Sequence, residues 1–149
     1  MKRNTRIVAT VLALIPAWIL GTSTLCTWAV AQGASPHWRL LFRILCHGIA
    51  RRCFDLWGTP MPICARCTGI YAGMLAGIVF FAVLPRIEER IARWVLGIAA
   101  VPMVIDGLTQ LALLRESTNG LRVETGLLAG AALTFWALSA VESPVLSTA

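Results

Sequence analysis

Four long apolar stretches, separated by short polar segments, dominate the chain. The first covers residues 7–31 without a charged residue and is long enough to cross about 30 Å of hydrocarbon as a helix. Three further apolar stretches cover residues 68–84, 94–114 and 125–141. The pattern predicts an all-α, polytopic membrane protein with about four transmembrane helices, forming a single membrane domain over residues 1–149.

The composition supports this fold class. The chain is 58% hydrophobic and 13% charged, whereas soluble domains are about 45–50% apolar and about 25% charged. The net charge of +6 is carried almost wholly by arginine, which suits anionic lipid headgroups. Because no nucleic-acid-binding motif accompanies the charge, we expect membrane lipid as a partner and no nucleic acid.

Four spans place both termini on one face of the cell membrane. They bring residues 32–67 and the loop at 115–124 together on the other face. Three basic residues precede the first span: Lys2, Arg3 and Arg6. Basic residues are divided almost evenly between the two faces, so this cluster decides the prediction that the termini are cytoplasmic. The Ala29-Val30-Ala31 sequence resembles a signal-peptidase site, and cleavage there is the alternative to a retained first span.

Glycines recur every four residues in the second apolar stretch, at Gly69, Gly73 and Gly77. Small residues at this spacing let helix backbones approach closely in lipid. Packing inside the helix bundle is the first interpretation, and a homo-oligomer through these glycines is the alternative.

A cysteine-rich segment covers residues 38–67, and the isolated Cys26 is interpreted as a core residue. The segment holds four of the five cysteines: Cys46, Cys53, Cys64 and Cys67. Cys64-Ala-Arg-Cys67 is a CxxC pair just before a predicted helix, an arrangement that binds a metal such as zinc or forms a reactive thiol pair. Cys46 with either His47 or Cys53 would complete a zinc site, and structural disulfides are the third interpretation.

Basic side chains recur every four residues in the same segment, at Arg39, Arg43, His47 and Arg51, with apolar residues between them. This pattern predicts a basic amphipathic helix lying at the membrane interface. Its arginines either extend toward water or bind an anionic headgroup.

Asp106 is the one charge in the third apolar stretch and shares a helical face with Thr109 and Gln110. A carboxylate at this depth belongs inside the bundle, either in a hydrogen bond between helices or in a site. The helix starts at Thr68 and Thr125, together with nearby arginines, favour an anion such as a phosphate. The residues predicted to bind it are Arg52, Arg66, Gln110, Arg115, Asn119 and Arg122.

The motif residues resemble a family of small prokaryotic predicted membrane proteins that is catalogued as a domain of unknown function. The likeness covers about residues 41–130 and rests on the following motifs: Cys46-His47, Arg52-Cys53-Phe54, Gly58, the block from Pro62 to Gly73 and Asp106-Gly107-x-Thr109-Gln110. Serine is usual in that family where this chain has Cys53. The resemblance therefore implies a ligand set of Cys46, His47, Cys64 and Cys67, with Cys53 as an alternate.

Three functions fit these residues. The first is a zinc-dependent membrane enzyme acting on a lipid-linked or anionic substrate, in which Asp106 or Glu116 moves protons. The second is a thiol–disulfide oxidoreductase in which Cys64 and Cys67 exchange electrons with Cys46 and Cys53. The third is a non-catalytic, metal-stabilised interaction module. The sequence identifies neither a substrate nor a reaction.

Overall fold

Four long helices form the protein, as a computed structural model of the chain shows for residues 3–84, 87–112 and 116–143. They are α1 (Arg3–Ala31), α2 (Ala65–Val83), α3 (Glu89–Leu111) and α4 (Asn119–Glu142). Each is long and apolar enough to cross a membrane. The all-α, multi-pass fold expected from the apolar stretches is therefore confirmed, and most of the helices extend past those stretches into the flanking polar residues.

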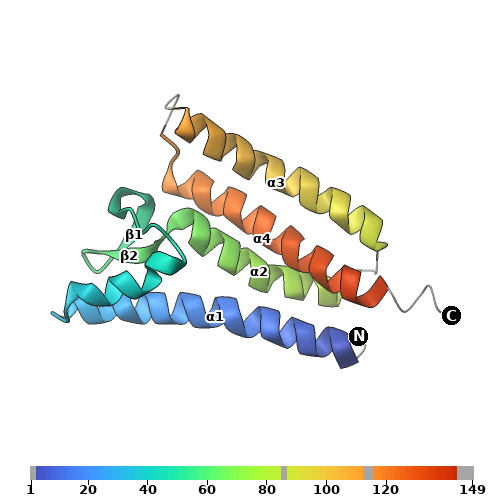
Figure 1. The fold of residues 1–149 in the computed structure, drawn as a ribbon, viewed down its shortest axis with the longest axis horizontal. Helices are drawn as coiled ribbons and strands as arrows, with labels where there is room; N and C mark the ends of the chain where they lie inside the picture. The colour runs from blue at the N-terminus through green and yellow to red at the C-terminus, as the bar shows by residue number, and fades with distance from the viewer. Residues whose placement is uncertain (1–2, 85–86, 113–115, 144–149) are drawn as a thin grey trace.

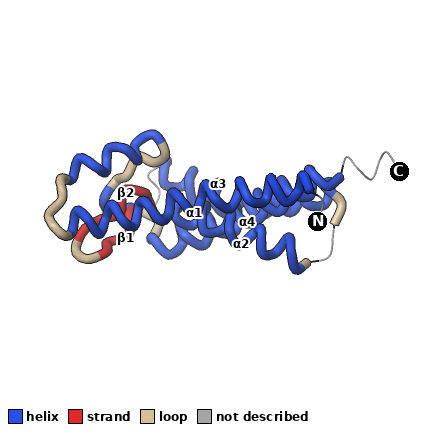
Figure 2. The backbone as a smooth tube through the Cα atoms, turned by 90° about the horizontal axis from the view of Figure 1, so that it is seen from below, coloured by secondary structure: helices blue, strands red, loops and turns tan. Residues whose placement is uncertain are grey.

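The helices run alternately up and down in a flattened row, in the order α1, α2, α4, α3 (Figures 1 and 2). The start of α1 and the end of α4 lie at the same end of the bundle, measured along the helix axes (Figure 1). The segment between α1 and α2 lies at the other end, beside the starts of α2 and α4 and the end of α3. This arrangement brings the cysteine-rich segment and the start of α4 to the same end of the molecule.

Glycines set the close approach of α2 to α4, the most extensive helix pair. A Cβ atom at Gly69, Gly73 or Gly77 would collide with the backbone of α4. Gly126 and Gly130 of α4 meet the backbone of α2 in the same way. Packing within the chain therefore accounts for these glycines without a second copy.

Two polar contacts hold α3, which packs along α4. Arg66 at the start of α2 forms an ion pair with Asp106, whose side chain is 2% exposed. At the opposite end, Trp136 Nε1 donates to Glu89 Oε1 at 2.9 Å. Asp106 thus lies inside the protein, as its depth in the apolar stretch predicted.

A small β-hairpin precedes α2 and was not expected from the sequence. Strand β1 (Cys53–Leu56) pairs antiparallel with β2 (Thr59–Cys64), with Cys53 opposite Cys64. The two turn residues, Trp57 and Gly58, have positive φ values of 55° and 72°, as a type I′ turn requires. The hairpin leads directly into α2 and fixes the position of the CxxC pair.

The predicted amphipathic helix is present but differs in kind and length. It is a 3₁₀ helix, η1 (Pro36–Ile44), and a second short 3₁₀ turn, η2, covers Ala50–Arg52. The η1 helix exposes apolar side chains, with Ile44 94% and Leu41 66% exposed, and buries Phe42. Such a surface suits the membrane interface. Because η1 ends at Ile44, His47 and Arg51 do not continue its basic face.

Candidate metal centre

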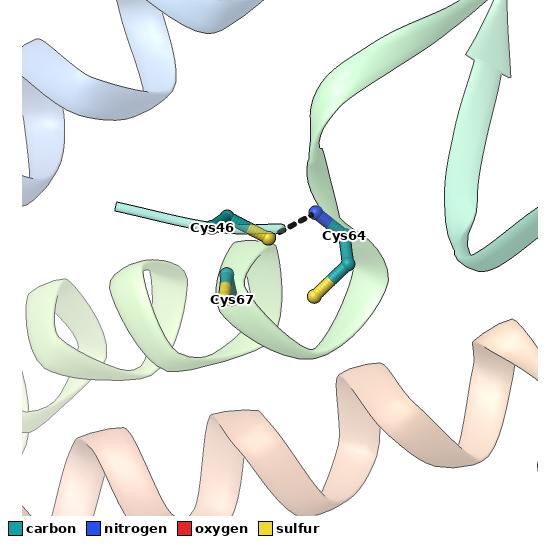
Figure 3. A group of neighbouring side chains, drawn as sticks. All are labelled: Cys46, Cys64 and Cys67. Carbon is teal, nitrogen blue, oxygen red and sulfur yellow. Dashed lines mark hydrogen bonds between the residues drawn. The ribbon is translucent and has the colours of Figure 1, made fainter. Parts of the chain in front are cut away.

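Three cysteine sulfurs meet where the hairpin enters α2 (Figure 3). Cys64 is the last residue of β2 and the N-cap of α2, and Cys67 lies in the first turn of the helix. Cys46 comes from the loop between η1 and η2. Among the described residues, the Sγ atoms of these three cysteines form a group that lies within 4.8 Å of one another. All five cysteines of the chain are free thiols.

Backbone geometry brings Cys46 to the CxxC pair. Gly48 has a φ of 57°, and a Cβ atom at this position would lie 2.8 Å from the carbonyl oxygen of Pro62. A glycine therefore lets the Cys46 loop lie directly against β2. The backbone N–H of Cys64 then donates to Cys46 Sγ at 3.2 Å (Figure 3).

The pKa values of the Cys46 and Cys53 thiols are shifted in opposite directions. Hydrogen bonds from the Cys64 and Cys67 side chains lower the pKa of the Cys46 thiol to about 2, and backbone N–H groups of Cys64 and Gly48 act in the same direction. Burial raises the pKa of Cys53 to about 11, and the neighbouring Cys46 and Cys64 add to this effect. The contacts around Cys46 therefore favour its thiolate, the form that binds metals, whereas burial favours the neutral thiol of Cys53.

His47 and Cys53, the other two predicted ligands, lie outside the sulfur group. His47 is exposed and lines a separate surface hollow with Arg39, Arg43 and Pro62. Cys53 is 5% exposed, packs near the three cysteines and directs its thiol to the carbonyl oxygen of Ile49 at 3.2 Å. The structure therefore brings together three of the four preferred ligands.

Arginine side chains gather near the start of α2, next to the three cysteines. Arg66, between Cys64 and Cys67, pairs with the buried Asp106. Arg52, Arg66 and Gln110, three of the predicted anion-binding residues, line one hollow of about 280 Å³ together with Gly107 and Leu111. One lining residue, Arg66, lies between Cys64 and Cys67 in the sequence, so the hollow adjoins the CxxC pair. Arginine side chains form part of its wall.

Arg122 and Asn119 lie beside this hollow at the start of α4. Arg122 is 5% exposed, and its Nη1 donates to Asn119 Oδ1 at 2.7 Å. With its amide oxygen turned toward them, Gln110 accepts from Arg122 Nη2 at 3.1 Å and from Ser117 N at 3.2 Å. Asn119 Nδ2 donates to the carbonyl oxygen of Cys53 at 3.1 Å, which ties α4 to the hairpin.

The two acidic residues predicted to move protons lie in different surroundings. Asp106 is buried beside Arg66. Glu116 has a side chain that is 73% exposed and forms an ion pair with Arg51 at 2.6 Å. Arg115, also predicted to bind an anion, lies outside the described residues.

The chain also matches a known family over the part that carries the site. A family described as "Predicted membrane protein (DUF2085)" matches residues 46–136. The chain belongs to this family. The match runs from Cys46 through most of α4 and includes all three clustered cysteines, Asp106 and Arg122.

The relatives among curated proteins are archaeal. An uncharacterised protein of Methanocaldococcus jannaschii is 41% identical over 100 residues, which are 66% of this chain and 64% of that protein. The match thus spans somewhat less than two thirds of that relative's length. An uncharacterised protein of Methanothermobacter thermautotrophicus is 42% identical over 93 residues, 62% of this chain and 83% of that protein. No solved structure matches the chain.

Two glycines at the site were not identified as functional from the sequence. Gly48 sets the path of the Cys46 loop, and Gly107 lines the arginine hollow. Each follows a motif residue directly or within two positions, in Cys46-His47-Gly48 and Asp106-Gly107. A glycine beside a reactive residue was the available signal for a close backbone approach.

Proposed function

We propose that this membrane protein is a zinc-dependent enzyme that acts at one face of the bilayer and binds one zinc ion through Cys46, Cys64 and Cys67. The single observation that carries the proposal is the convergence of three sulfurs within 4.8 Å. Zinc bound by thiolates at about 2.3 Å in a tetrahedron separates the sulfurs by about 3.8 Å. The three sulfurs therefore need little movement to hold the ion.

The number of ligands favours a catalytic role over a structural one. Structural zinc sites are closed by four protein ligands, whereas catalytic sites have three and leave a position for water or substrate. A zinc ion there would lower the pKa of a bound water and polarise an anionic substrate. Asp106, buried beside Arg66, is better placed than the exposed Glu116 to assist in such a site.

A thiol–disulfide oxidoreductase is the second candidate function. The pairing of Cys53 with Cys64 across the hairpin favours it, because a cysteine facing Cys64 on the neighbouring strand is close enough to exchange a disulfide with the CxxC pair.

Metal analysis of the protein, purified in detergent under reducing conditions, tests the proposal. We expect about one zinc per chain in the wild type, in Cys26→Ser and in His47→Ala, and loss of zinc in Cys46→Ser, Cys64→Ser and Cys67→Ser. Loss of zinc in His47→Ala would show that the ligand set is wrong. A metal-free wild type whose CxxC pair cycles between disulfide and dithiol would favour the oxidoreductase.

A further inference from the structure

Positive charge exceeds negative charge around the arginine hollow. The charges of Arg52, Arg66, Asp106 and Cys64 all act on the guanidinium of Arg122, which is 5% exposed. Three arginines thus face two groups that can carry a negative charge, Asp106 and Cys64. Since an uncompensated charge is costly to bury, an anion in the hollow would stabilise the cluster. Glu116 does not supply it, because it binds Arg51 on the surface.

Two arginines that line the hollow also have hydrogen-bond donors that are unpaired in the described part of the chain. The Nε atoms of Arg52 and Arg66 are buried and have no hydrogen-bond partner among the described residues. Guanidinium donors bind carboxylate and phosphate groups in their fork geometry. The volume of about 280 Å³ is just below the range of about 300–1,000 Å³ for pockets that enclose a whole ligand. The hollow therefore fits an anionic group rather than a complete amphiphile.

One side of the hollow adjoins the apolar surface of α3. Leu111, which lines the hollow, is 80% exposed, and Leu108 and Val104 are 59% and 51% exposed. These side chains face lipid when α3 crosses the membrane. A ligand in the hollow can thus continue into the bilayer without crossing a polar surface.

We propose that the hollow binds the phosphate group of a membrane lipid, with the acyl chains lying along the exposed face of α3. Arg52 and Arg66 bind the phosphate oxygens, and Gly107 leaves the space beside Arg66 open. The inference rests on the proposed function for the role of this lipid as the substrate. Binding itself depends on the arginines and not on zinc.

Gly107 allows the hollow to be filled without removing a charge. A Cβ atom there would lie 3.8 Å from Arg66 Nη1, an ordinary contact, so a leucine side chain would extend beside the guanidinium. Gly97 on the same helix is exposed, and a Cβ atom at this position would have nothing within 4 Å. Gly97→Leu is therefore the matched control for Gly107→Leu.

The test is native mass spectrometry of the full chain in detergent, titrated with dioleoyl phosphatidic acid. We expect Arg52→Gln and Gly107→Leu each to weaken binding about tenfold, and Gly97→Leu to bind as the wild type does. A thermal midpoint within a few degrees of the wild type shows that each variant is folded. Equal binding by the wild type and both hollow variants would overturn the inference.

Two further readings distinguish the source of the phosphate and the role of zinc. Displacement of the lipid by an equal concentration of inorganic phosphate would assign the site to the free anion and overturn the lipid claim. Zinc content comes from the same spectra. Retention of zinc in Arg52→Gln with weakened lipid binding supports both proposals. A zinc-free wild type with variant-sensitive lipid binding would overturn the proposed function and support this inference.

Discussion

Gly48 follows Cys46 by two residues and has a φ of 57°, a left-handed conformation that costs other residues about 1–2 kcal/mol. The close approach of Pro62 adds a steric barrier to that backbone cost. The position of the Cys46 sulfur thus depends on a residue that binds nothing itself. Gly33 has a φ of 97° but open space around its Cβ position. A substitution there therefore measures the backbone cost of a positive φ without the steric clash.

Gly48→Ala should therefore move the Cys46 loop away from β2 and weaken zinc binding about tenfold or more, the range found for residues that support metal ligands. Gly33→Ala should lose about 1 kcal/mol of stability and bind zinc as the wild type does. Competition with a chromogenic chelator measures both affinities. Equal zinc affinity in the two variants would contradict the role given to Gly48.

At the scale of the elements, backbone contact between α2 and α4 holds the centre of the row. A Cβ atom at Gly73 would collide with the carbonyl oxygen of Leu127 and lie 2.9 Å from Ala131 N. Because both are main-chain atoms, the helices themselves would have to separate. The matched position is Gly21 in α1, where a Cβ atom has nothing within 4 Å.

Gly73→Ala should lower the free energy of unfolding by about 1–3 kcal/mol, the cost of overpacking. Gly21→Ala should leave it unchanged or raise it by about 0.5–1 kcal/mol, because alanine loses less backbone entropy than glycine does when a helix forms. Unfolding in mixed micelles of increasing denaturing detergent measures the difference. A Gly73→Ala variant as stable as the wild type would show that α2 and α4 can separate at little cost.

The sequence predicted the helices better than the segment that carries the site. Apolar length decides a transmembrane helix, since lipid leaves the backbone no other partner. The hairpin was not predicted because Pro60 and Pro62 argue against a strand. In a two-stranded hairpin, however, each strand has one unpaired edge, and a proline without an N–H group is tolerated there. The four-residue period that ends at Arg51 predicted one helix, whereas η1 is a 3₁₀ helix that ends at Ile44. His47 lies outside the group of sulfurs to which it was assigned and lines another hollow.

The sequence also did not predict how the polar residues of the site pair with one another. The depth of Asp106 in an apolar stretch predicted its burial, but its partner Arg66 lies 40 residues away in sequence. The two come together because α2 and α3 both pack against α4. Sequence spacing therefore identified the residues that gather at this end and left their pairing open.

For the whole molecule, the alternation of the helices fixes which loops share a face. Asp55 in the hairpin and Thr118 before α4 are both exposed at one end, and Glu88 is exposed before α3 at the other. Cysteines introduced at positions 55 and 118 should react with a membrane-impermeant maleimide from the same side, and one at position 88 from the opposite side. With cytoplasmic termini, as the N-terminal basic residues predict, positions 55 and 118 react in intact cells. Reaction of these two from opposite sides would contradict the fold.

The flattened row of helices has one more consequence, for transport. Channels and carriers conduct through an interior that is enclosed by helices on all sides, but α1 and α3 stand at opposite edges of this row with α2 and α4 between them. A solute moving across the bilayer along a single copy would travel against lipid for most of its path. In a single copy, molecules would therefore reach the proposed site from the water at the membrane surface or by diffusing within the leaflet.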